Sequence, residues 1–186
     1  MLKEKYENLV DKVIYHKTNF GKGAAVRSGL KYVTGEIILI QDADLEYDPF
    51  DLIKFVDTVN SFSADLVIGS RFTLSKRSVL HFWHMLGNRI ITFVFNVLNN
   101  TTFTDIYCCY CLFKKDKINM NLLKSNGWGQ QAEILTFLVF GSKKIYELSV
   151  NYNARTYNEG KKIRYSNFFE VVYWLLLSRL RTYINK

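Results

Sequence analysis

An aliphatic run followed at once by acidic residues suggests a metal site. The stretch EIILIQDADLEYDP begins at Glu36, ends at Pro49 and contains Asp42, Asp44 and Glu46. Because Asp42 and Asp44 are two positions apart, an extended backbone would point both carboxylates to the same side. Mg²⁺ and Mn²⁺ prefer oxygen ligands, are commonly held by one or two carboxylates, and complete their shells with water and substrate phosphates. The spacing therefore predicts a site for Mg²⁺ or Mn²⁺ together with the diphosphate of a nucleotide.

The same acids have a simpler interpretation as a solvated turn. Asp48 stands just before Pro49, a preferred residue at the first helical position, so its side chain could cap the helix that follows. This interpretation accounts for Asp48 and Asp51. It accounts less well for Asp42 and Asp44, because ligands of open parallel sheets bind beyond the carboxyl ends of the strands.

Two glycines flank a lysine in the stretch NFGKGAAVRSGL. Gly21-Lys22-Gly23 could cradle a phosphate at a helix N-terminus, where backbone N–H groups have no helical partner. The stretch lacks the GxxxxGK[ST] spacing of a P-loop. Since a tight turn alone would also select glycine, both interpretations stay open from the sequence.

These residues belong to an alternating series of predicted strands and helices. A helix end is expected at 1–9, and strands are predicted at 10–16, 36–41, 64–72, 105–116 and 143–155. Helices are predicted at 24–33, 49–62, 78–100 with Gly87 as a candidate break, and 129–141. Because 36–41 is almost continuously apolar, we expect it to be covered on both faces, as in a parallel sheet. The alternation predicts an α/β fold with a mainly parallel sheet.

The composition indicates one globular domain with an anionic partner. The chain has 186 residues, 48% of them hydrophobic, with 25 Lys and Arg against 17 Asp and Glu, which gives a net charge of +8. This length is sufficient for a single core. The charge suits a phosphorylated substrate or an anionic membrane surface. We expect no nucleic-acid partner, because the basic residues are dispersed and no recognition motif is present.

The cysteines indicate the redox compartment of the protein, and the apolar stretches indicate whether it crosses a membrane. Cys108, Cys109 and Cys111 lack the paired CxxC spacing of zinc sites and cannot form a disulfide framework, so we expect buried thiols in a reducing compartment. MLKEKYENLVDKVIYHK has no apolar segment of the signal-peptide kind. The stretches IITFVFNVL and FFEVVYWLLLSRL are shorter than the roughly 20 residues that cross a bilayer. We therefore expect a chain that does not cross a membrane by itself.

Seven stretches, in this order, resemble one known family. They are NFGKGAAVRSGL, GEIILIQDADLEYDP, DLVIGSRF, LGNRIIT, TDIYCCYCLFKKD, GWGQQAEI and RTYNEGKKIRY. From about residue 13 to residue 165 the chain resembles a family 2 glycosyltransferase of the dolichyl-phosphate mannosyltransferase type. The resemblance implies a GT-A fold over residues 1–165 and transfer of a hexose, with inversion, from a nucleotide diphosphate sugar to a polyprenyl phosphate. The donor could be a mannose or a glucose nucleotide.

The resemblance also implies roles for individual residues. In such enzymes two aspartates, here Asp42 and Asp44, hold the metal that bridges the donor diphosphate, and Glu46 matches a position that can assist. The acceptor phosphate oxygen attacks directly, so positioning and charge stabilisation matter more than a strong general base. Catalytic roles are implied for Asp44, Arg71, Arg89 and Asp105, with the two arginines on the acceptor phosphate. Substrate contacts are implied for Gly21, Lys22, Asp42, Glu133, Lys161, Lys162 and Arg164.

Other interpretations of the basic residues remain open. By charge pattern alone, Arg89 could be a surface residue of an amphipathic helix, and the basic residues from 161 to 164 could form a solvated loop. Gln131 stands where the family commonly has an acid, so no role of that acid carries over to it.

The family's opening portion has no counterpart in this sequence. Its first strand, with a Val-Ile-Pro-Tyr-Asn-type motif, and its second strand, ending in Asp-Asp-Gly-Ser, are both absent. We therefore expect a fragment, a split enzyme whose other half comes from another polypeptide, or a remnant. The alternative function is a non-catalytic module that binds a membrane or a partner.

Residues 166–186 are predicted to form a C-terminal amphipathic helix. Its aromatic and leucine residues share an apolar face, and Arg179, Arg181 and Lys186 lie towards its end. Such a helix can lie in the interface of an anionic membrane, or it can pack on the core. The implied lipid acceptor favours a peripheral location at the cytoplasmic face of a membrane.

Overall fold

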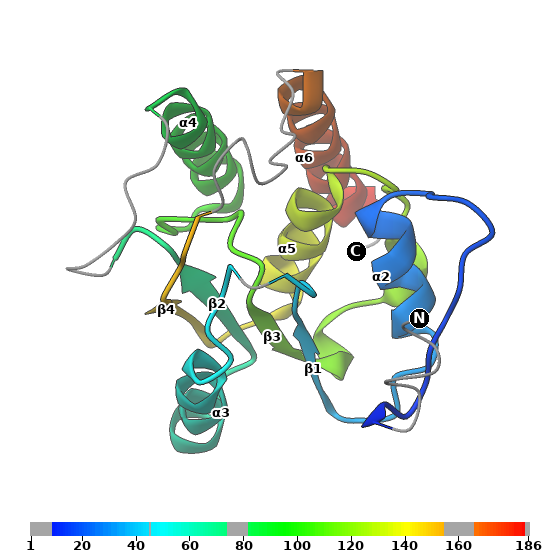
Figure 1. Cartoon of the computed structure of the whole chain (residues 1–186). Helices are drawn as coiled ribbons and strands as arrows, with labels where there is room; N and C mark the ends of the chain where they lie inside the picture. Colours follow the sequence, from blue (N-terminus) through cyan, green and yellow to red (C-terminus); the bar gives the residue numbers. More distant parts are fainter. Residues whose placement is uncertain (1–8, 45, 74–81, 155–165, 185–186) are drawn as a thin grey trace.

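A four-stranded sheet lies at the centre of the computed structural model (Figure 1). The structure describes residues 9–44, 46–73, 82–154 and 166–184. The strands are β1 (Ile37–Ile40), β2 (Leu66–Ser70), β3 (Cys111–Lys114) and β4 (Ile145–Ser149). Their order across the sheet is β1-β3-β2-β4.

One strand of the sheet runs against the others. β3 pairs antiparallel with β1, where Ile38 lies opposite Phe113, and antiparallel with β2, where Val67 lies opposite Leu112. β2 and β4 pair in parallel. β1, β2 and β4 therefore share one direction, so the predicted α/β architecture is confirmed and its sheet is mixed.

Helices surround this sheet, and most lie close to their predicted ranges. They are α2 (Lys22–Leu30), α3 (Asp51–Phe62), α4 (Phe82–Asn99), α5 (Gln130–Gly141) and α6 (Ser166–Ile184), with short 3-10 turns at Lys115–Lys117 and Met120–Leu122. α4 continues through Gly87, so the candidate break there is wrong. A glycine weakens a helix by only about 1 kcal/mol. Packing of Ile91 and Phe95 into the core holds the helix together.

The two faces of the sheet are covered by different helices. On one face, Ile134, Leu135 and Leu138 of α5 share the main core with Ile38 and Ile68. On the other face, α3 packs Phe55 and Val59 into a second cluster with Val67 and Leu112. The residues of β2 alternate between these two cores, which explains why all of them are buried.

β1 is covered on one face only, which corrects the expectation from its apolar run. Ile38 and Ile40 are buried, whereas Ile37 is 44% exposed and Leu39 is 36% exposed. α3 covers the part of the sheet around β2 and β3 and does not reach β1 (Figure 1). Within the described residues, β1 pairs with β3 alone, so its other edge is open.

The strand predicted at 10–16 is not formed. The described part of this segment has no regular structure, and Tyr15 is 60% exposed. Instead of pairing with a strand, the segment contacts α2: His16 Nε2 lies 2.8 Å from Ser28 Oγ, and Lys12 Nζ lies 3.6 Å from the centre of the Tyr32 ring. Its β-branched residues favour extended backbone, but a strand also needs a neighbour to pair with.

α6 packs on the main core. Val171 and Leu175 are buried in the same cluster as α5. Arg181 adds an ion pair to the buried Glu133, with 2.9 Å between Nη1 and Oε1. The opposite side of α6 keeps exposed apolar residues, including Leu180. The helix therefore has one apolar side packed on the core and further apolar residues on its exposed side.

Candidate functional site

The acidic loop begins where β1 ends. Because the strand stops at Ile40, Asp42 and Asp44 lie in a loop and not in extended strand, so strand alternation does not set their directions. Asp42 is paired with Lys22, the first residue of α2: Lys22 Nζ lies 2.7 Å from Oδ1 and 2.9 Å from Oδ2. Both side chains are partly exposed, at 41% for Lys22 and 34% for Asp42. The structure therefore brings together Lys22 and Asp42, to each of which the resemblance gives a substrate contact.

The loop is folded on itself and tied to the chain beyond β4. The backbone N–H of Glu46 donates to Asp44 Oδ1 at 3.3 Å. Glu46 Oε2 accepts from the hydroxyl of Tyr152 at 3.0 Å, and its carbonyl oxygen accepts from the N–H of Asn153 at 2.8 Å. Glu46 thus holds the loop in place. Its predicted assistance in metal binding remains a prediction.

The simpler interpretation of Asp48 as a helix cap is wrong, because α3 begins at Asp51 and its N-cap position, Phe50, has no side-chain cap. Asp48 closes the turn before the helix instead. Its Oδ1 accepts from the N–H of Phe50 at 3.0 Å, and its carbonyl oxygen accepts from the N–H of Asp51 at 3.1 Å. Asp51 accepts from the side-chain amide of Asn151 at 3.1 Å. Both acids therefore fix the start of α3 and the chain after β4.

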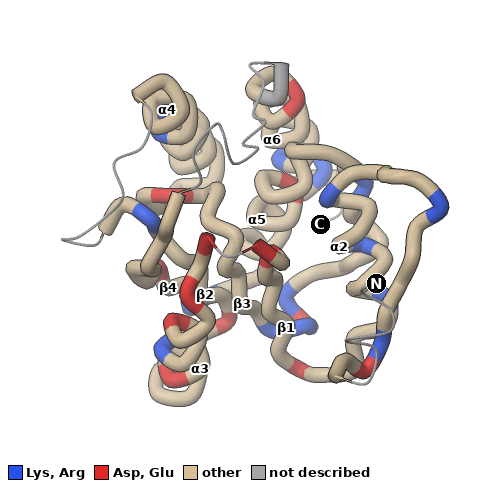
Figure 2. Tube along the Cα trace, in the orientation of Figure 1, with Lys and Arg blue, Asp and Glu red and all other residues tan. Residues whose placement is uncertain are grey.

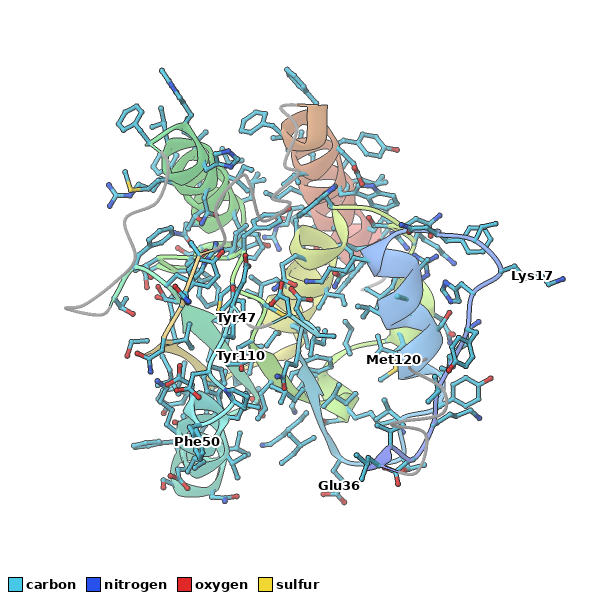
Figure 3. The ribbon with its side chains drawn as sticks, viewed as in Figure 1. Lys17, Glu36, Tyr47, Phe50, Tyr110 and Met120 are labelled. Atoms are coloured by element: carbon cyan, nitrogen blue, oxygen red, sulfur yellow. The ribbon has the colours of Figure 1, made fainter. Side chains whose placement is uncertain are left out.

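Three tyrosines form a cluster beneath the loop. The ring centre of Tyr47 lies 4.9 Å from that of Tyr110 and 5.0 Å from that of Tyr152. Figure 3 shows Tyr47 and Tyr110 close together near the middle of the molecule. Burial raises the pKa of Tyr152 to about 12, and the neighbouring Glu46 carboxylate adds to the effect. Tyr152 therefore stays protonated near neutral pH and donates to Glu46. No motif or spacing in the sequence indicates this cluster.

A buried ion pair lies next to the cluster. Arg71 donates to Asp105 through two nitrogens, with Nε 2.6 Å from Oδ2 and Nη2 2.8 Å from Oδ1. Asp105 also accepts from the backbone N–H groups of Arg71 and Tyr107, each at 3.1 Å, and from Asn88 Nδ2 at 2.8 Å. The Arg71 guanidinium also lies 5.2 Å from the centre of the Tyr152 ring. The pair therefore joins β2, α4 and the loop before β3.

The charges of this pair stabilise each other against burial. Burial alone would raise the pKa of Asp105, but the Arg71 guanidinium and its hydrogen bonds hold that pKa below its usual value. Burial alone would lower the pKa of Arg71, but the Asp105 carboxylate raises it well above its usual value. Both groups are therefore charged over the whole physiological range. Arg71 is in the first place a partner of Asp105, and its contact with an acceptor phosphate stays a prediction.

Asn88 reaches the ion pair, whereas its neighbour Arg89 lies on the exposed side of α4. The structure thus does not bring Arg89 together with Arg71. Sequence reasoning missed Asn88, although a polar residue beside Gly87 in an otherwise apolar helix was an available signal. A shift of one position on a helix turns a side chain by about 100°.

The phosphate cradle predicted at Gly21-Lys22-Gly23 is not open. The backbone N–H groups of Gly23 and Ala24 donate to the carbonyl oxygen of Asn126, at 2.8 and 3.3 Å. A Cβ on Gly21 would collide with the backbone of Asn126, and Gly21 has a φ of 92°. The glycines are therefore needed for close packing of α2 against the loop at 125–127. Only the Lys22 side chain faces the acidic loop.

Glu133 is not available to a substrate, which corrects the role implied for it. The residue is fully buried. Its carboxylate accepts from the backbone N–H groups of Lys124 and Ser125 at 2.9 Å and from Arg181 Nη1 at 2.9 Å. These partners use its oxygens to anchor the loop before α5 and the helix α6. Lys161, Lys162 and Arg164 lie outside the described residues.

The cysteines are buried and free, as the sequence predicted. Cys109 lies closest to the acidic loop, with its Sγ 4.0 Å from Lys22 Nζ. Burial raises the pKa of the Cys109 thiol to about 12, against the lowering effect of the Lys22 ammonium. The thiol is therefore protonated near neutral pH and is no candidate for a nucleophile.

The acidic loop fits a divalent cation bound together with a phosphate ligand. The described residues contain no group of three or more His, Cys, Asp and Glu that could hold a metal ion by itself. However, an ammonium group already bridges both oxygens of Asp42, which shows that this carboxylate accepts a cation. Asp44 supplies a second carboxylate nearby in the chain. Two carboxylates are enough for Mg²⁺ or Mn²⁺ when substrate phosphates and water complete the shell.

Charge and exposed apolar surface are distributed differently over the molecule. Lys and Arg are spread along the chain, from the N-terminal segment to α6 (Figure 2). Exposed apolar and aromatic residues line α4 and α6, namely Phe82, Trp83, Ile90, Phe93, Val97, Phe169, Tyr173, Leu176, Leu180, Tyr183 and Ile184. We call this set the α4–α6 apolar surface. Among the helices that the structure describes, none is long and apolar enough to cross a membrane.

Comparison with protein families gives a match over most of the chain. The family model described as Glycosyl transferase family 2 matches residues 3–120.

Several curated proteins are similar in sequence. Glycosyltransferase AglJ of Haloferax volcanii is 30% identical over 115 residues, 61% of this chain and 38% of the relative. The dolichyl-phosphate beta-glucosyltransferase of Saccharomyces cerevisiae is 28% identical, over 76% of this chain and 47% of the relative. Dolichyl-phosphate beta-glucosyltransferase ALG5D of Trichomonas vaginalis is 26% identical, over 93% of this chain and 54% of the relative. The chain thus spans about half the length, or less, of these relatives.

Solved structures share the fold at low identity. Glucosyl-3-phosphoglycerate synthase of Mycobacterium tuberculosis, solved with Mn²⁺, UDP-glucose and phosphoglyceric acid, has a TM-score of 0.56 at 15% identity, over 95% of this chain and 59% of that chain. Mannosyl-3-phosphoglycerate synthase of Rubrobacter xylanophilus has a TM-score of 0.54 at 13% identity, over 97% of this chain and 54% of that chain. These matches confirm the GT-A fold.

Proposed function

Because the chain belongs to glycosyltransferase family 2, we propose that it carries the metal-binding part of an enzyme that transfers a hexose from a nucleotide diphosphate sugar to a polyprenyl phosphate. The supporting observation is that Asp42 and Asp44 lie in the loop after β1, where the Lys22 ammonium pairs with Asp42. Glucose is the proposed sugar, since two of the relatives are named glucosyltransferases. Mannose is the alternative donor sugar.

Each part of the site has a proposed task in this reaction. Asp42 and Asp44 would hold Mg²⁺ or Mn²⁺, and the ion would supply charge neutralisation for the departing nucleoside diphosphate. The buried pair of Arg71 and Asp105 and the Tyr152–Glu46 contact fix the loop and the ends of the strands around the reacting groups. Such rigidity matters, because transfer to an ionised phosphate depends on positioning and charge stabilisation.

Calorimetric titration with uridine and guanosine diphosphates, with and without Mn²⁺, tests the proposal. We expect UDP to bind more tightly in the presence of Mn²⁺, because Asp42 and Asp44 would hold the cation beside its phosphates. The Asp44→Asn variant is the control and is expected to lose the effect of Mn²⁺. Tighter binding of GDP than of UDP would favour mannose over glucose.

A second candidate function follows from the open edge of β1. An unpaired strand edge with exposed Ile37 and Leu39 is a surface on which another polypeptide can add a strand. The chain could then be a non-catalytic partner-binding module, or it could need a second polypeptide to bind the donor. Failure of both nucleotides to bind in the calorimetric titration would favour this second candidate.

The α4–α6 apolar surface is proposed to contact the surface of a membrane, which is where a polyprenyl phosphate resides. α6 also carries Arg179 towards its end, and basic residues favour anionic lipid headgroups. Contact by two neighbouring helices would make the protein peripheral. We propose the cytoplasmic face as its location.

Co-sedimentation with vesicles of neutral and anionic phospholipids tests this contact. Leu180 on α6 is 61% exposed, so Leu180→Glu is expected to weaken binding about tenfold without disturbing the core. Ile53 on α3 is 60% exposed but lies away from α4 and α6, so Ile53→Glu is the matched control and is expected to bind as the unchanged chain does. Equal binding by all three proteins would refute the proposed surface.

A further inference from the structure

Lys22 occupies a position that a bound cation would need. Its ammonium lies 2.7 Å from one oxygen of Asp42 and 2.9 Å from the other, so it covers both acceptor atoms of that carboxylate. Neither side chain is buried, and burial therefore does not force the contact. The pair forms because α2 delivers a positive group to the end of β1.

The start of α2 is fixed firmly enough to make this contact specific. The carbonyl oxygen of Asn126 caps the N–H groups of Gly23 and Ala24, at 2.8 and 3.3 Å. Arg27, one turn further along, donates to the carbonyl oxygen of Ser125 and to the side chain of Asn126. The start of α2, directly after Lys22, is thus held by the loop at 125–127 through both backbone and side-chain hydrogen bonds. Lys17, in contrast, extends away from the body of the molecule (Figure 3).

A divalent cation and the Lys22 ammonium compete for the oxygens of Asp42. Lys22 Nζ lies within hydrogen-bond distance of both oxygens, and a metal ion would need at least one of them at about 2.0–2.1 Å. Two positive charges on one carboxylate repel each other even near a protein surface, so binding of a metal ion favours departure of the ammonium.

We propose that Lys22 is an internal substitute for the metal ion, which balances the charge of Asp42 in the metal-free protein and is displaced when a divalent cation binds. This inference rests on the proposed function, because it takes Asp42 as a metal ligand. It assigns to Lys22 the task of lowering the affinity of the free protein for cations. Loss of the ammonium should then make metal binding tighter, whereas loss of a residue that only helps to hold the site would make it weaker.

Titration of Mn²⁺ alone, without nucleotide, into the purified chain tests the proposal by calorimetry. We expect Lys22→Met to bind Mn²⁺ about three- to fivefold more tightly, which corresponds to the removal of one partly exposed ion pair. Lys22→Arg keeps the positive charge and is expected to bind Mn²⁺ as the unchanged chain does. Lys17→Met removes the same charge elsewhere and is also expected to cause no change. Asp42→Asn is expected to bind Mn²⁺ more weakly.

The outcomes separate this inference from the proposed function. If Asp42→Asn weakens binding but Lys22→Met does not tighten it, the metal site stands and the role of Lys22 is refuted. If Mn²⁺ alone binds none of the proteins, the exchange proposed for Lys22 is refuted, and the Mn²⁺-dependent nucleotide titration decides whether the metal site stands. If Mn²⁺ binds Asp42→Asn as well as the unchanged chain, Asp42 is not a metal ligand and the exchange is refuted with it. Equal tightening by Lys17→Met would also refute the role, because the effect would then reflect net charge alone. Thermal melts of each variant verify that it is folded.

Discussion

Asp105→Asn is expected to destabilise the protein by about 3–5 kcal/mol, the usual cost of removing one member of a buried ion pair. The side chain of Asp105 is fully buried, and that of Arg71 is 15% exposed. An asparagine would keep one acceptor oxygen but would present an NH₂ group to the guanidinium. Arg71 would then be a buried charge without its carboxylate. Urea unfolding, followed by circular dichroism, measures the change in the free energy of unfolding.

Two further variants make the test of the ion pair specific. Asp116 has a 69% exposed side chain, so Asp116→Asn is the matched control and is expected to change stability by less than about 0.5 kcal/mol. Arg71→Met combined with Asp105→Asn removes both charges and should recover part of the loss. A loss below about 1 kcal/mol for Asp105→Asn alone would show that the pair is not the anchor described above.

Asp44→Asn is expected to lower metal-dependent sugar transfer at least about 100-fold, because a neutral amide is a poor ligand for a hard cation that must neutralise the leaving diphosphate. Transfer of labelled glucose from UDP-glucose to a short-chain polyprenyl phosphate, at saturating Mn²⁺, measures the effect. The melting temperature should stay unchanged, because the Asp44 side chain lies in a loop outside the core.

Asp48 offers a control within the same acidic stretch. Asp48→Asn makes the same chemical change, and the asparagine oxygen can still cap the turn by accepting from the N–H of Phe50. We expect this variant to keep its activity within about threefold. Comparable activity of Asp44→Asn and Asp48→Asn would contradict a metal-binding role for Asp44. Absence of transfer by the unchanged chain would favour the non-catalytic alternative.

The sequence predicted those parts of the fold that depend on local patterns. Strands β1 and β2 and helices α3 and α5 lie within a few residues of their predicted ranges, because periodic apolar residues and turn residues act over short distances. β4 begins close to its predicted start but ends at Ser149, well before the predicted end at residue 155. The direction of β3 could not be predicted in this way. Its pairing with β1 and β2 depends on the path of the chain between Ser70 and Cys111, which periodicity does not describe.

In the predicted site, too, contacts between residues far apart in the chain could not be predicted from local patterns. The sequence predicts substrate contacts for both Lys22 and Asp42, and the structure pairs these two side chains. The role of the acids after β1 in metal binding stays a prediction. Glu133 was misjudged, because its partner Arg181 lies 48 residues further along the chain. Asn88 was missed in favour of Arg89, since the sequence does not fix the rotation of α4 to within one residue. Long-range partners and helix rotation are tertiary properties.

The docking of α6 has a consequence for how the protein would meet a membrane. Val171 and Leu175 belong to the core, and Arg181 neutralises Glu133, so α6 cannot leave the body without exposing apolar surface and a buried carboxylate. A helix on a flexible linker would act as a tether and would let the acidic loop sample many heights above the lipid. α6 would instead bind the membrane surface as a fixed part of the folded body. The distance from the loop at Asp42 to the lipid phosphates would then be set by the fold itself. The phosphate of the acceptor would have to reach the loop at that one distance from the membrane surface.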